Sequence, residues 1–108
     1  MPVSQGSAGG LPGMNLKAWA LIDAGGALIK SMGVASAAKL ATGEYRITFS
    51  APMATTKYLG RFTLRGFYAN APGGLDGYIK TWSLGSCDLA TLTGSGVMDV
   101  SGLWEFYE

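Results

Sequence analysis

The sequence predicts an all-β fold, an antiparallel β-sandwich of about seven to eight short strands with an N-terminal Gly-rich arm. The clearest period of two lies in Glu44–Met53, where Tyr45, Ile47 and Phe49 alternate with polar residues. Glycine supplies 17 of the 108 residues and favours turns over helices. No long stretch has the apolar spacing of a helix. A half-buried strand needs a second layer over its apolar face, and a second sheet provides it.

The chain is short enough for one domain and long enough to bury a core without disulfides. We expect residues 1–15 to form an extended arm and residues 16–108 to form the sandwich. Residues 1–13 are rich in Gly, Ser and Pro, carry no charge and cannot pack by themselves. They are either a loose tail or an arm that orders against a neighbouring subunit. The candidate assembly contacts in such an arm are Pro2, Val3, Leu11 and Pro12.

The first predicted strand, Leu16–Asp23, is apolar on both faces, with Trp19 and Leu21 on one of them. Burial on both sides is typical of a central strand or of a strand at a subunit interface. Two glycines in the following turn indicate a hairpin whose second strand is 27–32. The Ala-rich segment that follows could form a short helix. It is nevertheless too short for a stable one, and we expect a strand over 34–40 that pairs with the strand of Glu44–Met53.

The second half begins with the longest alternating pattern, Lys57–Tyr68, which predicts a strand with Gly60 and Gly66 on its apolar face. Residues 70–77 predict a loop. The next strand, Tyr78–Leu84, would place its two aromatic residues and Lys80 on one side. A short strand is expected over 89–92. The last strand is expected over 97–107, with Trp104 and Phe106 on one face and Leu103 and Tyr107 on the other.

The charge content restricts the partners. Charged residues make up 14% of the chain, which leaves uncharged surface and favours a homo-oligomer. The net charge is +1 and the basic residues are spread along the chain, a pattern that argues against nucleic acid. No apolar run is long enough to insert into a membrane, and no secretory signal is visible. We therefore expect a soluble protein synthesised in a cytoplasm.

The residues predict no catalytic, cofactor or metal site. Histidine, the usual general base and metal ligand, is absent. A Ser36–Lys39 pair matches a Ser-x-x-Lys pattern but lacks the companion motifs of that chemistry. Cys87 is the single cysteine and has no basic neighbour in sequence that would activate it. An enzyme that uses two of the carboxylates is the weakest alternative.

The aromatic residues leave a second alternative open, a lectin-like carbohydrate-binding module. Flat apolar rings stack on sugars, and Trp82, Tyr78 and Tyr107 are the candidate glycan or partner contacts. Most aromatic residues in a sandwich of this size belong to the core or to a subunit interface. Both interpretations predict a binding or structural module rather than an enzyme.

An ordered series of short motifs runs through Lys17–Tyr58: Ala18-Trp19-Ala20, Val34-Ala35-Ser36, Thr42-Gly43-Glu44-Tyr45-Arg46-Ile47-Thr48-Phe49, Pro52-Met53 and Tyr58. With this series the segment resembles a module found in bacteriophage tail-fibre and other small virion proteins. The resemblance covers about 40 of the 108 residues.

The resemblance implies a non-enzymatic structural protein of a tailed-phage virion, a homotrimeric tail-fibre or host-attachment module. A capsid decoration protein, of the cement or head-fibre kind, is the alternative within the same class. The implied partners are further copies of the chain, other virion proteins and a glycan on the host surface. The implied location is the virion, after synthesis in the host cytoplasm.

Overall fold

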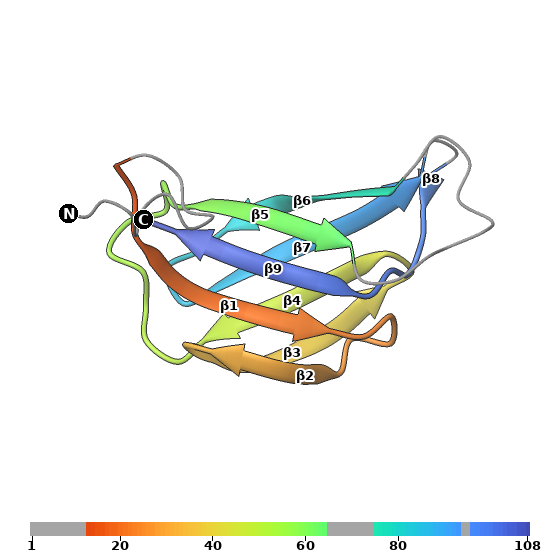
Figure 1. The fold of residues 1–108 in the computed structure, drawn as a ribbon, viewed down its shortest axis with the longest axis horizontal. Helices are drawn as coiled ribbons and strands as arrows, with labels where there is room; N and C mark the ends of the chain where they lie inside the picture. The colour runs from red at the N-terminus through yellow and green to blue at the C-terminus, as the bar shows by residue number, and fades with distance from the viewer. Residues whose placement is uncertain (1–12, 65–74, 94–95) are drawn as a thin grey trace.

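The computed structural model describes residues 13–64, 75–93 and 96–108. Within these ranges the chain forms two antiparallel sheets that pack face to face, and no helix (Figure 1). The predicted all-β sandwich is confirmed. The described residues accordingly include no helix long and apolar enough to cross a membrane.

The first sheet has the strand order β2-β1-β9-β5. Its strands are β2 (Leu28–Met32), β1 (Leu16–Ile22), β9 (Gly102–Tyr107) and β5 (Leu59–Leu64). The C-terminal strand β9 therefore lies in the centre of this sheet, between the first strand of the chain and β5 (Figure 1). The residue before β1, Asn15, exchanges two backbone hydrogen bonds with Glu108 at 2.9 and 3.0 Å, which brings the start of the described chain beside its C-terminal residue.

The second sheet has the strand order β3-β4-β7-β6, and a short strand, β8, also pairs with β7. Its strands are β3 (Val34–Ala41), β4 (Glu44–Phe49), β7 (Ser86–Thr93), β6 (Leu75–Trp82) and β8 (Gly96–Val97). The chain thus changes sheet after β2, after β4, after β5 and after β8, and β9 returns to the first sheet.

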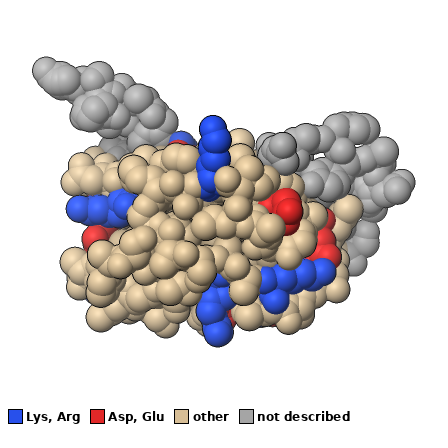
Figure 2. Space-filling view, turned by 90° about the horizontal axis from the view of Figure 1, so that it is seen from below, with Lys and Arg blue, Asp and Glu red and all other residues tan. Residues whose placement is uncertain are grey.

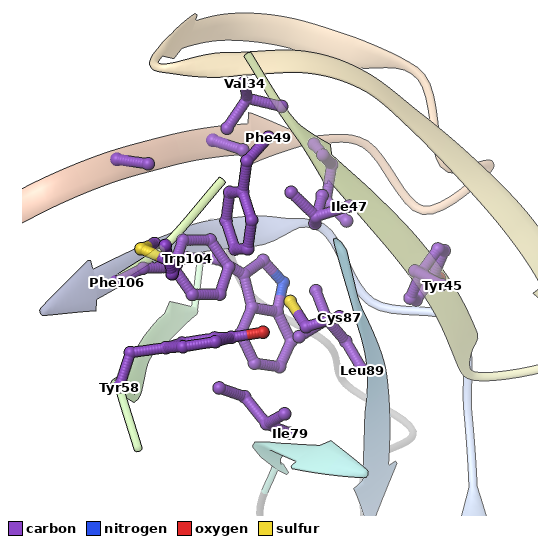
Figure 3. Packing of buried hydrophobic residues seen from close by; sticks show 14 residues of the cluster. Val34, Tyr45, Ile47, Phe49, Tyr58, Ile79, Cys87, Leu89, Trp104 and Phe106 are labelled. Atoms are coloured by element: carbon purple, nitrogen blue, oxygen red, sulfur yellow. The ribbon is translucent and has the colours of Figure 1, made fainter. Parts of the chain in front are cut away.

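The core lies between the sheets, and β4 faces it as its alternation predicts. Tyr45, Ile47 and Phe49 are buried. The Phe49 ring meets Tyr58 and Phe106 edge to face, with centroids 5.6 and 5.2 Å apart (Figure 3). Aromatic residues from β4, β9 and the segment before β5 therefore interlock the two layers.

Trp104 on β9 is the largest fully buried side chain among the described residues. Its ring packs against Phe62 on β5 with centroids 4.7 Å apart. A Cβ added at Gly77 on β6 would lie 2.7 Å from Trp104 Cη2 and 2.9 Å from Phe62 Cγ, so only glycine admits both rings here. The Trp104 Nε1 atom has no hydrogen-bond partner in the described part of the chain, a cost that this close packing must offset.

The strand boundaries differ most from the sequence prediction at three places. Asp76 and Gly77 belong to β6 and not to a loop, because Gly77 serves close packing rather than a turn. Strand β7 begins at Ser86 instead of at residue 89. The predicted last strand is divided into β8 and β9, because the chain crosses from the second sheet to the first over residues 98–101.

A register shift in β6 changes which side chains share a face. The pairing of β6 with β7 shifts between Ile79 and Thr81, which leaves Lys80 as an extra residue. Tyr78 lies opposite Ala90 and points outward, whereas Trp82 lies opposite the core residue Cys87. The prediction that Tyr78 and Trp82 share one face is therefore wrong, since strict alternation ends at the bulge.

Several predicted features lie outside the described residues. Of the predicted arm, the structure describes only 13–15. The candidate contacts Pro2, Val3, Leu11 and Pro12 fall in residues 1–12. Gly66, the end of the predicted strand 57–68 and most of the predicted loop 70–77 fall in residues 65–74.

Candidate assembly face

The outward faces of the two sheets can be assigned from the strand registers. Residues directly opposite each other in an antiparallel pair share a face, and neighbours along a strand alternate. Because Trp104 and Phe106 lie in the core, Leu103, Glu105 and Tyr107 point outward from the first sheet. On the second sheet the outward positions of β4 and β7 are read in the same way from the core residues between them.

The outer face of the second sheet is charged and polar. Arg46 on β4 binds Asp88 on β7 through two hydrogen bonds of 2.7 and 3.1 Å. The hydrogen bond from Arg46 is the main cause that holds the pKa of Asp88 below its ordinary value. Lys80 forms a second ion pair with Glu44 at 3.0 Å. This is the surface expected of a sheet face that remains in water.

The outer face of the first sheet is apolar instead. Leu16, Met32 and Leu59 are exposed by 40, 44 and 46% of their surface, large fractions for residues of this size. Three further apolar residues on this face are partly exposed. We call the following set the apolar outer face: Leu16, Trp19, Leu21, Met32, Leu59 and Leu103.

The strand register brings these residues together from distant parts of the chain. Trp19 on β1 lies opposite Met32 on β2. Leu16 and Leu59 both lie opposite Tyr107 on β9, one on each side of that strand. The apolar outer face therefore extends across all four strands of the first sheet.

An ion pair lies within this face and neutralises its own charges. Arg61 donates to Glu105 Oε1 from Nε at 3.1 Å and from Nη2 at 2.9 Å, and from Nη2 to the Tyr107 hydroxyl at 3.2 Å. The Arg61 guanidinium also lies 5.6 Å from the centroid of the Tyr107 ring. Burial, followed by the nearby Glu105 charge, raises the pKa of Tyr107 above its ordinary value. Since each of these polar groups already has a partner, covering them would leave none of them unpaired. Lys30, which lies opposite Leu21 on the same face, is exposed on the edge strand β2, where its long side chain can keep its charge in water at the rim of an interface.

Uncharged surface continues around the β2 and β3 side of the molecule. Figure 2 shows this side, where charged side chains are scattered over a mostly uncharged surface. Ile29 and Leu40 are both 44% exposed there. The uncharged surface therefore lies mainly on the first sheet and on the β2 and β3 side, whereas the outer face of the second sheet carries two of the ion pairs.

The three candidate glycan contacts do not share a surface, and one of them is buried. Tyr78 is 50% exposed on the outer face of the second sheet. Trp82 is 43% exposed at the end of β6, on the core side, and its Nε1 donates to the Tyr58 carbonyl oxygen at 2.9 Å. Tyr107 is only 1% exposed and lies beside Arg61. The structure does not bring these rings together into one platform.

The carboxylates have structural partners. Asp23 Oδ1 accepts from the Gly25 and Ala27 amides within the β1–β2 turn, and Glu108 accepts from the amides of Ala54 and Thr55. The other carboxylates accept hydrogen bonds or pair with Lys or Arg: Glu44, Asp76, Asp88, Asp99 and Glu105. The described part of the chain contains no group of three or more His, Cys, Asp or Glu that could hold a metal ion.

Sequence reasoning found part of the apolar outer face. The two apolar faces of the first strand were a usable signal, and so was Leu103 on the last strand. Leu16, Leu59 and Met32 were missed. Alternation along the first strand predicts Leu16 on the same face as Ala18, but the register shift between these two residues turns Leu16 outward. By alternation Leu59 shares its face with the charged residues Lys57 and Arg61, so only its position beside β9 shows that it extends the apolar outer face.

Comparison of the chain with family models, with curated proteins and with solved structures found no match.

Proposed function

We propose that this protein is a non-enzymatic structural subunit that self-associates through the apolar outer face of its first sheet. The supporting observation is the contrast between the two outer faces: one carries two ion pairs, and the other exposes Leu16, Met32 and Leu59 around the Arg61–Glu105 ion pair, with Lys30 on its edge strand β2. Contiguous exposed apolar surface of this kind marks an interaction site. The engagement of the carboxylates in turns and ion pairs supports a non-enzymatic role.

The expected gain from association can be estimated for single side chains. Burying the remaining surface of a residue such as Leu59 in a neighbouring copy contributes about 1 kcal/mol, less than half of the value for complete burial. Closed symmetric association lets every copy bury the same residues, so these small terms add across the interface. A homotrimer is the oligomer that we propose.

We place this subunit in a tailed-phage virion, as a tail-fibre or host-attachment module. The support is the resemblance of Lys17–Tyr58 to such modules, together with the low charge content that assembly into a particle favours. A capsid decoration protein would use the same face and differ in its location. Antibody-labelled particles under the electron microscope distinguish the two, because the label lies on the tail in one case and on the shell in the other.

Self-association is tested by light scattering coupled to size-exclusion chromatography. Leu59→Lys places a charge on the apolar outer face, and the matched control Ser36→Lys places it on an exposed position of β3 in the second sheet. We expect the unmodified protein and the control to have the mass of a trimer and Leu59→Lys that of a monomer, with similar melting curves. A monomeric unmodified protein would overturn the proposal, as would a trimeric Leu59→Lys variant.

A further inference from the structure

A groove of about 410 Å³ opens at the end of the sandwich where β1 begins and β9 ends. Its floor is apolar and consists of the buried side chains Ala18, Phe49 and Met53. Lys17 and Ala51 line its rim and are exposed. The volume lies in the range of about 300–1,000 Å³ that is typical of ligand pockets.

Hydrogen bonds from backbone amides fix the walls of the groove. The carboxylate oxygen Oε2 of Glu108, on its rim, accepts hydrogen bonds from the amides of Ala54 and Thr55 at 2.6 and 3.0 Å and so fixes one wall. The Met53 amide donates to Leu84 at 2.7 Å, and the Ser50 amide donates to the Gly33 carbonyl oxygen at 3.0 Å. An occupant would therefore not have to order this loop on binding, which lowers the cost of binding.

The chain itself contains a segment whose chemistry fits this groove. Residues 1–12 carry no charged side chain and include Pro2, Val3, Leu11 and Pro12. Apolar side chains of this size match an apolar floor. Proline has no backbone N–H, so burying it leaves no donor without a partner.

The length of the preceding segment allows it to reach a neighbouring copy. Asn15 is fixed by two backbone hydrogen bonds to Glu108, a residue that lines the groove, so residues 1–12 are attached to the sandwich beside the end where the groove opens. An extended segment of 12 residues spans roughly 40 Å, enough to reach another copy. Because the proposed self-association brings copies together, we assign the groove of one copy to the segment of its neighbour.

We propose that residues 2–12 of a neighbouring copy lie in this groove and cross-connect the oligomer. This inference rests on the proposed self-association, and it assigns a defined partner surface to the arm. The two proposals can fail separately, because association through the apolar outer face does not depend on the groove.

Disulfide trapping between two single-cysteine additions tests it. An Ala51→Cys protein with an affinity tag is mixed with an untagged Val3→Cys or Ser7→Cys protein, and subunits are exchanged before mild oxidation. We expect a mixed disulfide dimer on non-reducing gels with one or both arm variants. In the control, Thr42→Cys in the β3–β4 turn replaces Ala51→Cys, and the yield of mixed dimer should be at least tenfold lower. Cys87 is buried and does not interfere.

Each outcome is decisive. A mixed dimer that is specific for Ala51→Cys supports the proposal, since each chain carries only one added cysteine and the bond must join two copies. A trimer without a mixed dimer, or with equal trapping at Thr42, overturns it and leaves the proposed function intact. A protein that is monomeric throughout overturns both.

Discussion

The Asp99 carboxylate accepts a hydrogen bond from the Gly43 amide at 2.6 Å, although 56 positions separate the two residues in sequence. The other carboxylate oxygen of Asp99 pairs with Lys39. Gly43 lies in the β3–β4 turn, and Asp99 lies where the chain crosses between sheets. One side chain therefore fastens this end of the second sheet to the segment that leads into β9.

This contact predicts an acid-sensitive contribution to stability. Burial alone would raise the pKa of Asp99, but the hydrogen bonds from Lys39 and Gly43 outweigh it and hold the pKa below its ordinary value. A carboxyl group with a lowered folded-state pKa stabilises the fold above the unfolded pKa of about 3.9, and this stabilisation is lost as the pH falls through the folded value. We expect Asp99→Asn to lower the free energy of unfolding by about 1–2 kcal/mol at neutral pH and by much less in strong acid.

Urea denaturation at a series of pH values measures this difference. The control is Asp76→Asn, an exposed carboxylate that accepts from the adjacent Gly77 amide, which should change stability by less than about 0.5 kcal/mol. If the effect of Asp99→Asn were constant from neutral to acid pH, the carboxylate charge would not be its cause.

Gly43 itself should tolerate no side chain. Its φ is +69°, in the left-handed region, and an added Cβ would lie 2.7 Å from the Thr91 carbonyl oxygen and 2.9 Å from the Met98 amide. We expect Gly43→Ala to destabilise the protein by about 2–4 kcal/mol, since backbone strain and a clash with backbone atoms combine. Thermal melts followed by circular dichroism provide the measurement.

The matched control for that substitution is Gly85→Ala. No heavy atom lies within 4 Å of a Cβ built at Gly85. Its effect should stay within about 0.5 kcal/mol. Equal destabilisation at the two positions would mean that the turn geometry at Gly43 is not its cause.

The facing of β4 can be tested at two adjacent residues. Phe49 is buried between Tyr58 and Phe106, so Phe49→Ala should cost about 3–5 kcal/mol through lost burial and a residual cavity. Thr48 points outward and is partly exposed, so Thr48→Ala should cost less than about 1 kcal/mol. Denaturant melts that gave similar small losses for both would contradict the assigned facing.

The Cys87 thiol should be unreactive in the folded protein. Burial, with a smaller contribution from the Asp88 charge, raises the pKa of its thiol to about 12, and the side chain is 1% exposed. We expect no alkylation by iodoacetamide at mildly alkaline pH and complete alkylation in denaturant. An Ala51→Cys protein, labelled in parallel, reports that the reagent is active. Rapid native labelling of Cys87 would show that the core opens between β6 and β7.

Much of the fold could be predicted because the signal is local. The alternation in β4 specifies both a strand and its buried face, since successive side chains in a strand point to opposite sides. The apolar residues on both sides of β1 predicted that its outward face, as well as its core face, carries apolar side chains. Turn glycines such as Gly43 marked the hairpin correctly, because a positive φ is a property of single residues.

The sequence by itself therefore determined the strands, most of their facings and the uncharged character of the surface. Only the tertiary structure decided that β9 lies between β1 and β5, and hence that Leu16 and Leu59 lie on either side of Tyr107. It also decided the bulge at Lys80, which separates Tyr78 from Trp82. Strand order and register depend on which distant segments pair. The pairing is decided by the free energy of the whole sandwich, so no period or spacing within a single segment reveals it.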